Sequence, residues 1–179
     1  MAQIVLGHIA LIQRSKKQDF SLKVLSELKA MGHEVVGLFP GECREPEYLE
    51  ELNELVKELN LQKDVLFLGR REDIPDLLKL MDVLIIPSFE GFPLAGLEAA
   101  AAGVPVVACE EAGAKEFVDF SKAGLTYPEG DVVNAGRAIM HIYDNTEYKK
   151  RGICFASGVS LKAYKSKVIE CFGKVITHN

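Results

Sequence analysis

Short apolar runs alternate along the chain with segments in which apolar residues recur at every third or fourth position. The runs predict buried strands at residues 4–10, 34–39, 65–68, 83–87, 104–108 and 125–127. The segments between them predict helices at 17–31, 45–59, 73–81, 93–102, 113–120 and 132–143, with two more between 146 and about 175. Strands that are apolar on both faces and alternate with helices are typical of a parallel sheet covered on both sides.

This alternation predicts a doubly wound, Rossmann-like α/β domain over residues 1–145. We expect the strand order 3-2-1-4-5-6, with the strands at 4–10 and 83–87 adjacent at the centre. In such a sheet the ligand lies beyond the carboxyl ends of the strands, where the strand order reverses. Residues 146–179 are predicted to form a C-terminal helical tail.

Composition narrows the class of protein. The 179 residues are 48% apolar and 26% charged, which is typical of a globular domain. The net charge of −5 argues against a nucleic-acid partner, because nucleic-acid binders usually present a basic face. The four cysteines are scattered without a C-x-x-C pair, so they indicate reduced thiols in the cytoplasm and no metal site. No G-x-G-x-x-G follows the first strand, which argues against a dinucleotide-dependent dehydrogenase.

Two carboxylates interrupt the otherwise apolar stretch "PSFEGFPLAGLEAAAAGVPVVA", and they are Glu90 and Glu98. Glu90 falls in the loop after the fourth strand, and Glu98 about one and a half turns into the next helix. Because Glu98 adjoins an apolar stripe of Leu94, Leu97 and Ala101, we expect it to be largely desolvated and to need a partner. Paired hydroxyls of a sugar or ribose suit a carboxylate. The competing interpretations are a lysine-paired surface residue for Glu98 and a solvated loop residue for Glu90.

The start of the same helix adds an anion signal. Free backbone N–H groups at its N-terminus, around residues 91–94, favour a phosphate, and Gly91 lets the backbone approach closely. Upstream, Ser15 and Gln18 have the spacing of a capping box, which predicts that Lys16 and Lys17 lie in the first turn of a helix. Cations there oppose the helix dipole unless an anion binds. The other interpretation is two solvated surface lysines.

With these residues in place, the chain resembles the C-terminal, nucleotide-sugar-binding domain of the group 1 retaining glycosyltransferases, which have the GT-B fold. The E-x7-E pair in its apolar setting carries the resemblance, together with "VLFLGRREDIPDLLKLMDVLIIPS" and "AGAKEFV", which contains Gly113 and Glu116. The resemblance covers about residues 4–143. It implies a nucleotide-diphosphate sugar as donor, with uridine or guanosine as the base, and no further cofactor or metal.

The resemblance also implies roles for single residues. Glu90 and Lys16 would be catalytic, with Glu90 on the hydroxyls of the donor sugar and Lys16 on the donor phosphates. The nucleotide would be bound by Glu98 through its ribose, by the backbone of Gly91, Phe92 and Pro93 through its diphosphate, and by Arg70 and Arg71 around its base.

The chain departs from the family pattern at two places. An arginine that holds phosphate usually precedes the family lysine, and Leu11 stands at that position. The family often has Gly-x-Gly after the second strand, where this chain reads Pro40–Gly41–Glu42. His8 and Arg14 are the candidate substitutes for the arginine.

A GT-B enzyme needs two Rossmann-like domains, and the resemblance covers one. We therefore interpret the chain as the donor domain of a hexosyltransferase-type enzyme that acts in the synthesis of surface polysaccharide on a saccharide or lipid-linked acceptor. It would be incomplete without an N-terminal Rossmann-like half. The whole protein would be cytoplasmic or peripheral at the inner membrane. The alternative is a degenerate, non-catalytic domain that serves as scaffold for an active transferase, and a nucleotide-sugar epimerase also stays open. In a fragment, apolar tail residues such as Val159 and Phe172 would be partly bare.

Overall fold

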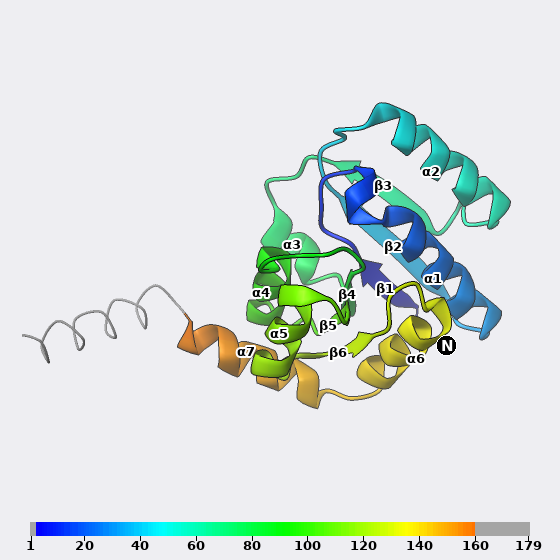
Figure 1. Ribbon diagram of the computed structural model, residues 1–179. Helices are drawn as coiled ribbons and strands as arrows, with labels where there is room; N and C mark the ends of the chain where they lie inside the picture. The colour runs from blue at the N-terminus through cyan, green and yellow to red at the C-terminus, as the bar shows by residue number, and fades with distance from the viewer. Residues whose placement is uncertain (1–2, 160–179) are drawn as a thin grey trace, which may run out of the picture.

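The computed structural model describes residues 3–159. Its core is a six-stranded parallel sheet in the order β3-β2-β1-β4-β5-β6, which confirms the predicted fold and strand order (Figure 1). The strands are β1 (Ile4–Gly7), β2 (Val35–Pro40), β3 (Val65–Gly69), β4 (Val83–Ile86), β5 (Val106–Cys109) and β6 (Gly124–Tyr127). The two strands expected at the centre are adjacent, with Leu6 opposite Val83 and Gly7 opposite Leu84.

Helices cover both faces of the sheet, as the apolar runs predict. Figure 1 shows one layer on each side, and the two layers enclose separate apolar cores. The first layer is formed by α1 (Gln18–Ala30), α2 (Pro46–Glu58) and α6 (Val132–Tyr143). The second is formed by α3 (Ile74–Leu78), α4 (Leu94–Ala101) and α5 (Ala112–Ser121). All residues of β4 and β5 are buried, because these strands have apolar side chains on both faces and a helix layer on each side.

The first helix begins later than the sequence predicts. A 3-10 turn, η1 (Arg14–Lys16), follows β1 and its loop, and Lys17 then adopts a left-handed conformation with φ of 54°. The capping box does not form, because its two side chains bond elsewhere. The Gln18 amide donates to the carbonyl oxygen of Leu11 at 2.8 Å, and the Ser15 hydroxyl accepts from Gln13 at 2.7 Å. Lys16 and Lys17 therefore precede the helix.

The tail begins with a helix that packs on the domain. This helix, α7 (Glu147–Gly158), lies against α4 and α5, and a Cβ at Gly152 would lie only 3.1 Å from the Ala100 carbonyl oxygen. Phe155 contacts Phe117 of α5 edge-on. The division of the chain at residue 145 stays a prediction. The predicted second tail helix and most of its apolar residues fall outside the described residues, and Val159 is 47% exposed.

Candidate functional site

A cavity of about 300 Å³ opens at the carboxyl ends of β1 and β4, where the strand order reverses. Its wall is built by the loop after β1, by Lys16, by the end of β4 and by the first residues of α4. Glu90, Phe92 and Pro93 lie in this wall, so the structure brings four of the predicted site residues into one cavity. Gly91, between Glu90 and Phe92, is exposed and does not line the cavity.

Lys16 and Glu90 meet inside this cavity. The Lys16 ammonium donates to Glu90 Oε1 at 2.7 Å, and the Ser88 hydroxyl donates to the same oxygen at 2.8 Å. The Lys16 and Glu90 side chains are 24% and 23% exposed, and Ser88 is fully buried. The structure therefore brings both charged residues into one cleft, and the interpretation of Glu90 as a solvated loop residue is wrong. Sequence reasoning missed Ser88, although its place at the end of a buried strand was a signal.

The start of α5 packs against the loop that carries Glu90 and fixes its backbone. The Gly113 N–H donates to the carbonyl oxygen of Glu90 at 3.0 Å. A Cβ at Gly113 would lie 1.8 Å from the carbonyl oxygen of Gly91, so no other residue fits there without moving this backbone. Phe92 adds an edge-on contact with Phe117 at 6.3 Å between ring centres. The glycine of "AGAKEFV" therefore positions the candidate site.

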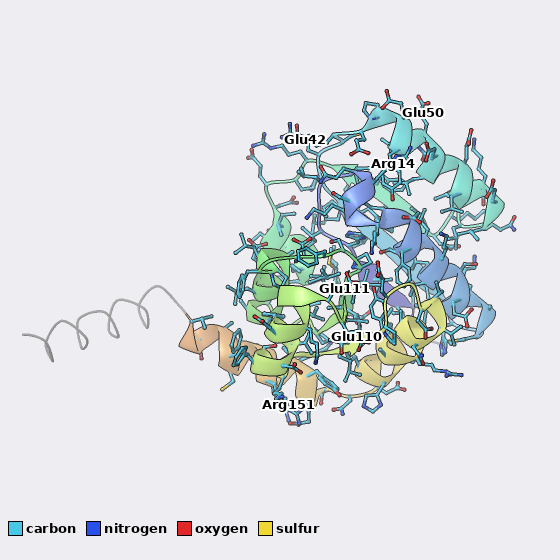
Figure 2. The ribbon with its side chains drawn as sticks, in the orientation of Figure 1. Arg14, Glu42, Glu50, Glu110, Glu111 and Arg151 are labelled. Atoms are coloured by element: carbon cyan, nitrogen blue, oxygen red, sulfur yellow. The ribbon has the colours of Figure 1, made fainter. Side chains whose placement is uncertain are left out.

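Neither candidate substitute for the missing arginine supplies a cation. His8 lines the cavity, but it is buried and its Nδ1 bonds the Ser21 hydroxyl at 2.9 Å. Burial, helped by the positive charge of Lys16, lowers the pKa of His8 to about 3, so its ring is neutral. Arg14 points away toward α2, where it pairs with Glu51 and lies over the Tyr48 ring (Figure 2). Among the described residues that line this cavity, Lys16 alone carries a positive charge.

Lys17 also turns away from the cavity. Its left-handed backbone directs the ammonium to Glu129, with Nζ 2.5 Å from Oε1, and this hydrogen bond holds the pKa of Glu129 below its usual value. The expectation of two lysines that face one anion from a helical turn is therefore wrong, because Lys17 leaves the 3-10 turn in a left-handed conformation and its side chain diverges from that of Lys16. Lys16 alone faces the cavity.

A second cavity adjoins the first and shares its wall at residues 9–11. Arg70 and Arg71 lie here, and Asp73 holds Arg71 through hydrogen bonds of 2.8 and 2.5 Å. Glu42 lines the same cavity and pairs with Arg44 at 3.3 Å. The acidic residue that departs from the family pattern therefore lies beside the two arginines.

Glu98 lies elsewhere on α4 and is exposed, so the expectation of a largely desolvated carboxylate is wrong. The buried face of α4 consists of Gly96, Ala99 and Ala100, whereas Leu94 is 68% exposed. Small residues bring this helix close to its neighbours and turn Glu98 outward, toward α3. There it lines a third cavity with residues of α3, including Ile74, which also lines the second. Within residues 3–159 Glu98 makes no ion pair, which leaves the lysine-paired interpretation unsupported.

The three cavities follow one another as a track, since the first and second share residues 9–11 and the second and third share Ile74. An ammonium and the N-terminus of α4 suit phosphate, and carboxylates suit hydroxyls. In the described part of the chain no three side chains gather as ligands for a metal ion. No helix in the same residues has the length and apolar character needed to cross a membrane.

Comparison with known proteins agrees with this arrangement. The family model described as "Glycosyl transferases group 1" matches residues 3–145. A D-inositol 3-phosphate glycosyltransferase of Corynebacterium jeikeium is 32% identical over 130 residues, which are 68% of this chain and 30% of that protein. A UDP-Gal:alpha-D-GlcNAc-diphosphoundecaprenol alpha-1,3-galactosyltransferase of Escherichia coli is 36% identical over 89 residues, or 49% of this chain and 23% of that protein.

Solved structures share the fold. Anabaena Alr3699/HepE, in complex with UDP and glucose, superposes with a TM-score of 0.84 at 24% identity, over 96% of this chain and 48% of that chain. WaaG, a glycosyltransferase involved in lipopolysaccharide biosynthesis, gives a TM-score of 0.79 at 19% identity, over 93% of this chain and 46% of that chain. The chain thus spans about half of these structures and at most about a third of the curated relatives named above. Because the family match covers most of its length, the chain belongs to the group 1 glycosyltransferases.

Proposed function

We propose that this chain is the donor-binding, C-terminal half of a retaining GT-B glycosyltransferase, and that its donor is a UDP-sugar. The observation that carries this proposal is the cavity at the reversal of strand order, where Lys16 and Glu90 face each other beside the N-terminus of α4. The solved relatives that hold UDP, or UDP with a sugar, support uridine as the base.

The site offers a place for each part of such a donor. The sugar would contact Glu90, and the diphosphate would lie between Lys16 and the backbone of residues 91–93. The ribose would reach Glu98 along the track of cavities, and the base would lie beside Arg70 and Arg71. During transfer the bond between the anomeric carbon of the sugar and the diphosphate oxygen would break, a bond would form between that carbon and a hydroxyl oxygen of the acceptor, and the hydroxyl proton would pass to the leaving diphosphate. Lys16 and the α4 N-terminus would then stabilise the charge on the leaving diphosphate, the role that Mg²⁺ has in other transferases.

The acceptor and a second domain complete the proposal. The loop around Glu90 presents the apolar side chains of Phe89, Phe92 and Leu94, each more than half exposed. We propose that an N-terminal Rossmann-like half covers this surface and binds a saccharide or lipid-linked acceptor, as in surface-polysaccharide synthesis. Hexosyl transfer, a cytoplasmic or peripheral membrane location and inactivity of the isolated chain belong to the same proposal.

A second candidate function has specific support. Leu11 stands where the family has a phosphate-binding arginine, Lys16 is the one cation among the described residues of the first cavity, and Glu42 lies in the second. These features favour a non-catalytic domain that acts as scaffold for an active transferase. Calorimetric titration of the chain with UDP, GDP, UDP-glucose, UDP-galactose and UDP-N-acetylglucosamine separates the two functions. Binding of a UDP compound supports the donor domain, whereas no binding of any of these compounds at millimolar concentration supports the scaffold.

The role of Glu98 has its own test. If Glu98 accepts hydrogen bonds from the ribose hydroxyls, Glu98→Gln should weaken UDP binding about tenfold, because a charged acceptor becomes neutral. The free energy of unfolding should stay within about 0.5 kcal/mol of the unsubstituted protein, since Glu98 is exposed. Calorimetry and urea unfolding measure the two effects. Glu50→Gln, an exposed carboxylate on α2 (Figure 2), is the matched control, and equal UDP affinity in all three proteins would remove Glu98 from the site.

A further inference from the structure

The two charged groups of the first cavity are each other's partners. Lys16 Nζ lies 2.7 Å from Glu90 Oε1, and Ser88 adds a hydrogen bond to the same oxygen at 2.8 Å. Both charged side chains are about three-quarters buried. The group suited to phosphate and the group suited to sugar hydroxyls therefore neutralise each other's charge.

The ion pair weakens the binding of a diphosphate that carries no sugar. To engage Lys16 fully it must draw the ammonium away from Glu90, whose carboxylate then keeps one protein donor, Ser88. If the Lys16–Glu90 ion pair stays formed, the phosphate enters a cavity in which the two charges cancel and the Glu90 carboxylate lies in the wall. In both cases the like charges of phosphate and carboxylate repel across a partly buried space.

Within residues 3–159, no other side chain of this cavity offsets the repulsion between phosphate and Glu90. His8 is neutral, Arg14 is engaged with Glu51, and the family's arginine position is Leu11. In a site with a second cation the pair could open at little cost. In this cavity Lys16 and Glu90 are each other's charged partner, so separating them leaves both without an ion pair.

A sugar on the diphosphate changes the balance, because its hydroxyls can donate to Glu90 when Lys16 leaves. We propose that the Lys16–Glu90 ion pair makes this site favour sugar-bearing diphosphates over the bare diphosphate. The inference rests on the proposed function, and it adds a consequence for turnover. Once the sugar is transferred, Glu90 loses its hydroxyl partners, and the pair closes again as the nucleoside diphosphate leaves.

The test compares three forms of the full 179-residue chain by calorimetry: the unsubstituted protein, Glu90→Gln and Glu110→Gln. The probes are inorganic pyrophosphate, UDP and the three UDP-sugars named above. Glu90→Gln keeps the size of the side chain and its acceptor for Ser88 but removes the charge. It should bind pyrophosphate and UDP roughly fivefold more tightly, and the UDP-sugars no more tightly than the unsubstituted protein does.

Glu110→Gln is the matched control, because this exposed carboxylate follows β5 at the same edge of the sheet (Figure 2). An equal gain in Glu110→Gln would overturn the inference, since the effect would then come from net charge. So would UDP binding that Glu90→Gln leaves unchanged, while the proposed donor function would stand. If both the unsubstituted protein and Glu90→Gln bind none of the probes, the donor function falls and this inference with it. Thermal melting of each form confirms that the affinities refer to folded protein.

Discussion

Gly113→Ala is expected to lower the free energy of unfolding by about 3 kcal/mol, because overpacking against fixed backbone costs this much. The new Cβ would lie 1.8 Å from the Gly91 carbonyl oxygen and 2.8 Å from that of Glu90. Both are backbone atoms of the loop that carries the candidate site, so the clash cannot be relieved by rotating a side chain. Urea unfolding measures the loss. The displaced loop should also weaken binding of a UDP-sugar.

Gly91→Ala is the matched control for this prediction. A Cβ at Gly91 would have no atom within 4 Å, and Gly91 lies outside the positive-φ region, so the substitution should leave stability nearly unchanged. It should still reduce diphosphate binding if phosphate lies on this backbone. Equal stability of Gly113→Ala and the unsubstituted protein would show that α5 does not fix the Glu90 loop in this way.

The fold could be predicted from the sequence because the strongest signals were local. Runs such as "VLII" in β4 and "VVAC" in β5 are apolar on both faces, which only a doubly covered parallel sheet explains. Pro93 and Gly103 bracket α4, and Gly103 has the positive φ that its place after a helix requires. These constraints act within a few residues, so one sequence is enough to recognise them.

The predictions were wrong where contacts between residues far apart in the sequence determine the local structure. The turn before α1 depends on a hydrogen bond from Gln18 to Leu11 and on a short parallel bridge between Ile12 and Cys43, and neither is visible as a local pattern. The predicted burial of Glu98 was wrong because α4 buries a face of small residues. A search for periodic large apolar side chains gives such a face little weight. The small face of α4 fits closely against neighbours, and a Cβ at Gly96 would lie 3.2 Å from Ile86 and Phe117.

The candidate site was predicted in part. The sequence pointed to Glu90 through its apolar setting and to Lys16 through the family resemblance, and the structure pairs them. It did not reveal Ser88, the neutral state of His8 or the close approach of Gly113, since each depends on which groups the fold brings together. The roles of Glu98, Arg70 and Arg71 toward a nucleotide stay predictions.

The stability of this protein is expected to fall by about 2 kcal/mol between pH 7.5 and pH 5 through His8 alone. Burial lowers the pKa of His8 in the folded protein to about 3, whereas the unfolded chain has the ordinary value of about 6.5. Between these two pH values His8 is protonated in the unfolded chain and neutral in the folded protein. The contribution of neutral His8 to the free energy of unfolding is therefore fully present above pH 6.5 and is lost as the pH falls toward 3.

His8→Gln isolates this contribution, because it keeps a polar group within reach of Ser21 and cannot take up a proton. Urea unfolding of both proteins at several pH values should show a stability difference that shrinks by about 2 kcal/mol from pH 7.5 to pH 5. Carboxylates that titrate in this range are common to both proteins and cancel. His141→Gln, at an exposed position on α6, is the matched control. If His8→Gln keeps the pH dependence of the unsubstituted protein, the His8 ring takes up a proton in the folded state, and a cation other than Lys16 would then stand in the cavity.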